Sequence, residues 1–485
     1  MRHTIRYDWQ APAAFLAMSA LLCLAALIFN LNPFLVLGGG AAALAFLYAA
    51  YRVPELFLVA VLFIPQLKAF WPLQPIDKIV DLTGVMLAGL AIGLSLRLLH
   101  RSAGLERWRP IGSLSGLKLP IILYFVFAAV VAASYFETSA PHYGGSKLLR
   151  FLGIGTLLFF SSFVLIREER DLRRVALLFV GCGMITAVQI LAHLETRNAA
   201  AMGDEDITRI GAGWLMGMTI VLLLYFRFIE RDYLHRTVVI IGLPLLVAGL
   251  VASVARGPMV ALALVVPINF FLTLKSRKLG TSIAMILLAV VSTYGAFSVL
   301  LTVAPERTQA KLNELVRLAE GESGSGSAVK RIPFYKTALF AIPAHPLLGR
   351  GIGSWSVYYY GSDTRNYPHN MFLEVAFEEG LLGLGILWLF LAAVGDSSLH
   401  LLRVTGPRYA AFPSLVLFSV AVGMFSGDID DDRMVWFWAG LTLAVCRVAA
   451  RLVYEHQSMM PPVRRPVSVR VFDPTRPENR HTAIP

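Results

Sequence analysis

The sequence carries little charge for its length. Asp, Glu, Lys and Arg make up 15% of the 485 residues, whereas soluble domains usually carry roughly a quarter. Hydrophobic residues make up 57% of the chain, and they gather in runs of about 18 to 24 residues, long enough to cross a bilayer as helices. The composition therefore excludes a soluble enzyme and predicts an all-α fold, a polytopic transmembrane helical bundle.

Features of metal, redox or nucleotide sites are also scarce. Three cysteines, Cys23, Cys182 and Cys446, each lie inside an apolar run, so neither a disulfide framework nor a zinc site is predicted. The glycines of GRGIGSW at 349–355 follow no strand pattern and lack the dinucleotide spacing. We interpret them as a turn that brings the chain close to a ligand or the membrane. For Asp428–Asp432, a solvated or headgroup-facing turn is favoured over a cation site. No metal and no cofactor are predicted.

The hydrophobic runs give about 12–14 spans, from residues 11–29 to residues 434–454. The first run has no cleavage site leading into a soluble domain, so we expect it to be retained. With the N-terminus in the cytoplasm, most of the 43 Lys and Arg residues fall on the cytoplasmic side, as the positive-inside rule requires. Both termini are then cytoplasmic. The net charge of +12 largely reflects this bias, which argues against a nucleic-acid partner.

Four regions follow from this pattern: transmembrane helices over 1–304, a periplasmic loop over 305–370, transmembrane helices over 371–454, and a basic, disordered cytoplasmic tail over 455–485. Within the loop, apolar spacing predicts an amphipathic helix over Glu306–Glu320. Gly321–Gly326 reads as a flexible joint. A second helix is expected over Phe334–Ile342, with Pro333 in its first turn. Such a helix–joint–helix loop can close over a site or cap the bundle, and the pattern favours neither.

Two arginines lie where hydrocarbon begins. Arg209 opens a span, and Arg256 separates two apolar runs with almost no loop around it. An arginine at a helix centre costs roughly 2.5–3.5 kcal/mol on insertion scales and less near the interface, so it usually has an anionic partner or faces a polar cavity. Each arginine taken alone can instead snorkel to headgroups. With Arg331 and His369 on the same face, we favour an anionic partner such as a diphosphate, which suits the planar guanidinium.

These residues belong to motifs that carry a family resemblance. Arg331 precedes a short helix, and then come HPLLGRGIG at 345–353, HNMFLE at 369–374 and EGLLG at 379–383. Upstream lie SVARG at 253–257 and Arg209, after which this chain has Ala212 between two glycines where the family pattern leads us to expect glycine. Together, over roughly residues 200–440, they resemble the O-antigen ligase and polymerase superfamily of bacterial envelope glycosyltransferases.

The resemblance implies an inverting, metal-independent glycosyltransferase of the bacterial inner membrane. Its donor would be a glycan on undecaprenyl diphosphate, and its acceptor lipid A–core or another glycan. His369 matches the catalytic base or acceptor-orienting residue, and Arg209 and Arg256 match the arginines that hold the diphosphate. From the residues themselves we add Arg331 to the diphosphate site. Asn370 and Glu374, four apart at a helix start, are expected to bond to each other or to orient the histidine.

Several alternatives stay open at this level. Ligation to lipid A–core, polymerisation of repeat units and transfer to protein all fit the motifs. A transporter or flippase of an anionic lipid-linked saccharide also fits a bundle with buried arginines, but it predicts repeated halves, and no repeat is evident. The aromatic run from Trp355 to Tyr360 suits sugar stacking or an interfacial belt, and we favour the belt. Membrane lipids are expected partners in every case.

Overall fold

The computed structural model describes residues 33–68, 80–102, 115–192, 204–226, 233–273, 279–303, 309, 313, 327–430 and 432–459. Every regular element within these residues is a helix, and none of them forms a strand. The predicted fold class, an all-α polytopic bundle, is confirmed. The predicted helix over 306–320, the joint over 321–326, the first hydrophobic run and the tail beyond Met459 lie outside the described residues, apart from positions 309 and 313.

The helices of the first half are α2 (Pro33–Arg52), α3 (Pro54–Leu67), α5 (Leu82–Ser102), α6 (Ser115–Ser134), α7 (Pro141–Arg150), α8 (Thr156–Leu165), α9 (Glu169–Ala192) and α10 (Asp204–Phe226). The second half contains α11 (Tyr233–Ser253), α12 (Arg256–Thr273), α13 (Leu279–Val303), α15 (Ser327–Ala341), α16 (Trp355–Tyr360), α17 (Met371–Glu378), α18 (Gly380–Thr405), α19 (Ala411–Ser426) and α20 (Arg433–Met459). Short 3₁₀ turns include Tyr135–Glu137 and Ile342–Ala344, and a π-helical segment over Phe151–Gly155 joins α7 to α8.

Seven helices in the described residues are long and apolar enough to cross a membrane. An eighth span results if the pair 42–52 and 54–67, which bends by 104° at its break, is counted as one. Four shorter apolar helices, over 237–253, 256–272, 286–302 and 411–426, add to the bundle. Each of these segments overlaps a predicted hydrophobic run, because sustained apolar composition is what makes a helix stable in lipid.

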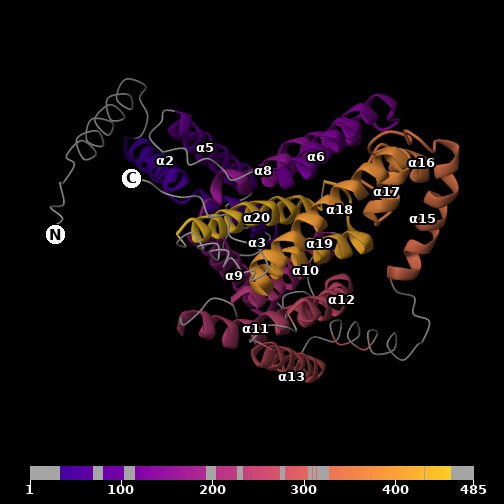
Figure 1. Cartoon of the computed structure of the whole chain (residues 1–485). Coiled ribbons are helices and arrows are strands. Elements are labelled where there is room, and N and C mark those ends of the chain that lie inside the picture. The colour runs from indigo at the N-terminus through magenta and orange to yellow at the C-terminus, as the bar shows by residue number, and fades with distance from the viewer. Residues whose placement is uncertain are drawn as a thin grey trace, which may run out of the picture.

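Helix α10 lies at the centre of the bundle. In its apolar window 89% of the residues are buried, compared with 22% in that of α5. It packs against α9, α11, α12 and α19, while α18 packs against α6 and α20. Figure 1 shows α15, α16 and α17 gathered at one end of the bundle, beside the ends of α6 and α18. We call this the site end.

The other end is tied together by arginines. The Arg447 guanidinium donates to the carbonyl oxygens of Phe163 and Ile166, each at 2.7 Å, where α8 ends. Arg408, just after α18, forms an ion pair with Glu169 at the start of α9. Carbonyls at the end of a helix have no intrahelical partners, and Arg447 supplies the missing donors at the end of α8. Both arginines lie on the side of the bundle that the predicted topology makes basic.

Two predicted boundaries are wrong. Pro368–Asn370 does not open a long span, because the short helix α17 ends at Glu378 and Gly380, with a φ of 72°, redirects the chain into α18. The second loop helix begins at Ser327, so Pro333 lies inside α15 rather than in its first turn. The lost backbone hydrogen bond at Pro333 is offset because α15 buries Ala338 and Ala341 against the loop.

Candidate active site

Two of the predicted site residues, Asn370 and Arg331, meet at the last turn of α19. The Asn370 side-chain amide donates to the Met424 carbonyl oxygen at 3.1 Å, and the Arg331 guanidinium donates to the Phe425 carbonyl oxygen. Carbonyls in the last turn of a helix lack intrahelical partners and carry partial negative charge. Two predicted site residues from separate segments therefore cap the same helix.

Arg256 reaches this position through a tight turn. Helix α11 ends at Ser253 and α12 begins at Arg256. Between them Val254 adopts a φ of 55°, which is costly for a β-branched residue. A Cβ placed on Gly257 would lie 3.5 Å from the Cβ of Phe425, so the segment that carries Arg256 is in contact with the end of α19.

Arg209 lies on α10 and is 8% exposed. One turn further along, on the same face, Gly213 supports the Arg256 turn: a Cβ there would lie 2.6 Å from the Cβ of Ala255. A larger residue at 213 would push the two arginine-bearing elements apart. Helix packing thus explains the small residue at position 213. Because Gly213 makes this contact, the contact does not require glycine at position 212.

His369 sits directly before α17 with a φ of 58°. Its ring lies 4.6 Å from that of Tyr367 and 6.0 Å from that of Phe334, between centroids, and the Tyr335 hydroxyl donates to its carbonyl oxygen at 3.3 Å. Among the described residues, none hydrogen-bonds to its buried Nδ1. A positive φ is uncommon for a residue other than glycine. Among the described residues the other example is Val254, two positions before Arg256.

Electrostatics keep His369 neutral. Burial and, after it, the positive charge of Arg331 lower its pKa to about 4, while Asp428 opposes both. Burial also lowers the pKa of Arg331, because taking a cation out of water disfavours its charged form. The imidazole is therefore an unprotonated base at neutral pH, next to a desolvated cation that would gain from an anionic partner.

Asn370 and Glu374 have separate tasks. The Asn370 side-chain oxygen accepts from the backbone nitrogens of Phe372 and Leu373 at 3.1 and 3.0 Å, which makes it the N-cap of α17. Glu374 accepts from Lys147 and from the backbone nitrogen of Ile429 at 3.2 Å. The backbone nitrogen of Glu374 donates to the Asn370 carbonyl oxygen at 2.9 Å, but the two side chains bond to other parts of the fold.

The glycine turn lies against the protein's own backbone. Gly349, Gly351 and Gly353 have φ values of 72°, 89° and 77°, which glycine adopts without strain. A Cβ on Gly349 would lie 2.4 Å from the Glu378 carbonyl, and one on Gly351 would lie 2.4 Å from the Thr138 nitrogen. The turn thus locks α17 to the loop after α6.

The aromatic run is a buried cluster and only partly an exposed surface. Trp355 is fully buried and packs with Ala338, Ala341 and Phe377, and its ring lies 5.3 Å from that of Tyr359. The favoured interfacial belt is therefore wrong for Trp355. Such a cluster gives the loop a small core of its own, which holds α15 against α17.

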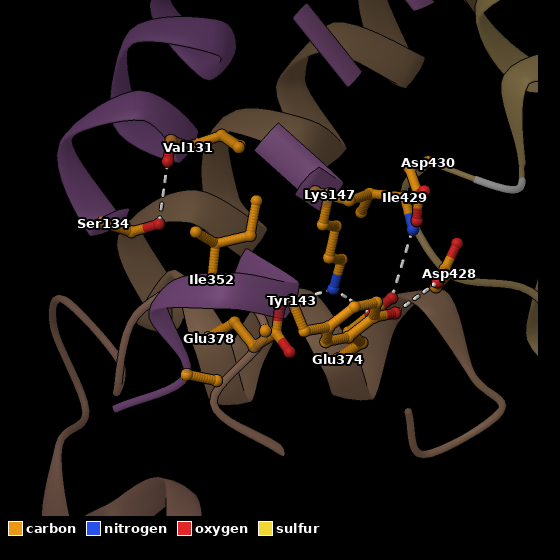
Figure 2. Close-up of polar contacts among 12 residues, drawn as sticks. Val131, Ser134, Tyr143, Lys147, Ile352, Glu374, Glu378, Asp428, Ile429 and Asp430 are labelled. Atoms are coloured by element: carbon orange, nitrogen blue, oxygen red, sulfur yellow. Dashed lines mark hydrogen bonds and ion pairs between the residues drawn. The ribbon is translucent and has the colours of Figure 1, made fainter. Parts of the chain in front are cut away.

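The acidic run is also buried, contrary to the solvated turn expected for it. Asp428, Asp430 and Asp432 are 0%, 8% and 3% exposed. Asp428 accepts from the Tyr143 hydroxyl at 3.1 Å, and Asp430 pairs with Arg150 at 2.8 Å. Figure 2 shows Tyr143, Asp428 and Asp430 near Lys147. Within the described residues no group of three or more His, Cys, Asp or Glu has a geometry suited to a metal ion.

Sequence reasoning missed Lys147, which joins Glu374 and Glu378. One signal existed: Tyr143, Lys147 and Arg150 follow helical spacing at the start of an apolar run. A polar stripe in such a place marks a face turned toward protein. Its partners lie more than 220 positions away in the chain, so no local pattern identifies them.

Comparison with known proteins bears on the same segment. No curated protein matches the chain. Residues 238–388 match the family model described as O-antigen ligase. This range includes Arg256, Arg331 and His369 but not Arg209. The match supports a membrane glycosyltransferase of that general type, and it confirms the resemblance of this chain to the O-antigen ligase superfamily.

Proposed function

We propose that the protein transfers a glycan from a polyprenyl diphosphate, of the undecaprenyl type, to an acceptor sugar hydroxyl. His369 is the general base, and Arg209, Arg256 and Arg331 bind the diphosphate. Asn370 and Glu374 support the histidine through α17. The reaction inverts the anomeric carbon and needs no metal or nucleotide.

The observation that carries the proposal is the convergence at the end of α19. Arg331 of α15 bonds to the Phe425 carbonyl oxygen, and Asn370, next to His369, bonds to the Met424 carbonyl oxygen. Gly257, next to Arg256, lies against Phe425, and Gly213, one turn after Arg209 on α10, lies against Ala255 on the other side of Arg256. A diphosphate leaving group gains negative charge in the transition state, and fixed guanidinium groups act where that charge develops.

The neutral imidazole supplies the other half of the chemistry. A sugar hydroxyl is a weak nucleophile, and proton transfer to a positioned base typically contributes roughly 10²–10⁴-fold. The Nδ1 of His369 accepts the hydroxyl proton as the acceptor oxygen attacks the anomeric carbon. The bond from that carbon to the diphosphate oxygen breaks, and the arginines hold the leaving diphosphate.

We place the enzyme in the bacterial inner membrane with the site end facing the periplasm, because most Lys and Arg residues then lie on the cytoplasmic side. A periplasmic reporter fused at Ser323 checks this orientation, and activity only in the cytoplasm would contradict it.

The deciding experiment is transfer by purified protein in excess chelator without nucleotide. Wild type should form a new glycosidic bond, and His369→Ala should lower the rate by at least about 10²-fold with an unchanged unfolding temperature. Supplying purified lipid A–core or a second lipid-linked repeat unit as sole acceptor separates ligase from polymerase.

Two outcomes contradict the proposal. Activity that is lost in chelator and restored by magnesium or manganese contradicts metal independence. A transporter is indicated instead if no acceptor yields product while vesicles move the lipid-linked sugar across the bilayer even with His369→Ala.

A further inference from the structure

Helix α7 presents one polar face to the site end. Tyr143, Lys147 and Arg150 are spaced i, i+4 and i+7, so their side chains project from the same side. The π-helical segment Phe151–Gly155 follows directly. A π-turn adds a residue and rotates the helix before it relative to the helix after it, and such turns are frequent at functional sites. The polar face of α7 can therefore point in a different direction from the one it would have if α7 and α8 formed one regular α-helix.

Lys147 lies between two carboxyl groups of α17. Its ammonium donates to Glu374 Oε1 and, at 2.5 Å, to Glu378 Oε2, and all three side chains are 0% exposed. Figure 2 shows the lysine side chain reaching from α7 toward the two glutamates. Burial raises the pKa of both carboxyl groups, and the Lys147 ammonium opposes that rise. These charges have no water to solvate them, so their mutual geometry is narrowly constrained.

Helix α17 needs such a support. It has only 8 residues, too few to be stable without tertiary contacts. Its N-terminus carries Asn370, with His369 immediately before it in a strained backbone conformation. Glu374 and Glu378 are i and i+4 on α17, so the Lys147 ammonium group binds one face of the helix at two successive turns. The glycine turn grips the opposite end, since the backbone nitrogens of Arg350 and Gly351 donate to Phe377 and Glu378 at 3.0 and 2.9 Å.

We propose that Lys147 is a positioning residue of the active site: by binding Glu374 and Glu378, its ammonium group holds α17, and with it His369, in register with the arginine-bearing elements. The inference rests on the proposed function. Misplacing a reacting group by about 1 Å costs on the order of 10²-fold in rate, so the ion triad acts on catalysis without touching substrate.

The test separates position from stability. Lys147→Met alone would leave two carboxyl groups buried without a counter-ion, which is strongly destabilising. The informative variant is Lys147→Met/Glu374→Gln/Glu378→Gln, which removes all three charges at similar volume. Because neutral replacement of a whole buried ion cluster is often tolerated, we expect an unfolding temperature close to wild type. We expect kcat to fall by about 10²-fold, with the donor KM changed by no more than a few-fold.

A matched control uses the same helix face. Arg150→Met/Asp430→Asn removes the pair one turn further along α7, which contacts the segment after α19 and not α17. This control should keep kcat within about two-fold, as expected for a partly exposed pair. An equal fall in both variants would show general loosening of α7 and would overturn the proposal.

Wild-type kcat in a stable triple variant would overturn it as well. Should the triple variant not fold, Glu378→Gln alone removes one charge of the clamp and predicts a several-fold fall in kcat; an unchanged kcat contradicts the proposal. Product formation by wild type, absent in His369→Ala, is measured in the same assay. It shows whether the proposed function stands whatever the Lys147 result.

Discussion

Two charged regions lie at the same end of the bundle and are built on different plans. Around Lys147, one ammonium and two carboxyl groups are fully buried and bonded to one another. Around His369, the bond that Arg331 makes goes to a neutral carbonyl, and the imidazole is held among aromatic rings. The first region pairs its ammonium group with carboxyl groups inside the protein. The second retains positive charge beside a neutral base.

This difference separates architecture from chemistry. A buried ion cluster that satisfies itself fixes the relative position of helices but offers nothing to a ligand. A desolvated guanidinium group such as that of Arg331 favours an anion, because burial strengthens that attraction. The comparison fits the proposed division, with substrate binding in the arginine region and positioning in the Lys147 region, and three predictions test it.

The largest effect is expected at Arg256. Arg256→Lys keeps the charge but loses the planar two-point grip on a diphosphate. Hydrogen bonds to charged groups contribute about 1.5–3 kcal/mol, so kcat/KM should fall by about 10–10²-fold in the transfer assay. Arg150→Lys is the matched control, since that arginine pairs with Asp430 within the protein, and its effect should stay within a few-fold. Equal losses at the two positions would erase the distinction between the regions.

An intermediate effect is expected from the backbone lock. Gly351→Ala forces a φ of 89° on an L-residue and places its Cβ 2.4 Å from the Thr138 nitrogen. We expect a loss of about 2–4 kcal/mol in the free energy of unfolding, measured by denaturation in detergent. Gly361→Ala has a φ of 70° but no atom within 4 Å, so it should cost only about 1–2 kcal/mol. Equal costs would mean that the close approach at Gly351 has no energetic role.

The smallest effect is expected from mild acid. Because the pKa of His369 is lowered to about 4, the imidazole gains a proton only near that pH and stays neutral from pH 7 to about 5. The kcat/KM value, which reports the free enzyme, should therefore be nearly flat over that range and decline toward pH 4. An imidazole with the ordinary pKa of about 6.5 would already lose about ten-fold by pH 5.5. A decline centred near pH 6.5 would contradict this prediction and would mean that His369 is more solvated and farther from positive charge.

Some errors of prediction share one cause. The acidic run looked solvated, and the glycine turn looked ready for a ligand, because neither segment contains its own partners. Asp428 bonds to Tyr143, 285 positions earlier, and Gly351 approaches Thr138 from the other half of the chain. Local pattern reports composition and periodicity, whereas the satisfaction of a buried polar group depends on what the fold brings beside it.

The amino-acid sequence by itself determined the all-α class and the positions of the apolar helices, and it supplied the residues proposed for the site. Apolar length decides which segments cross a membrane, and arginine or histidine at a span end stands out against a background of 15% charged residues. Tertiary structure alone decided that Gly213 packs against Ala255, that Arg331 and Asn370 meet at the end of α19, and that Lys147 joins α7 to α17. Those facts depend on close approach between residues up to 231 positions apart, and packing rather than periodicity settles such distances.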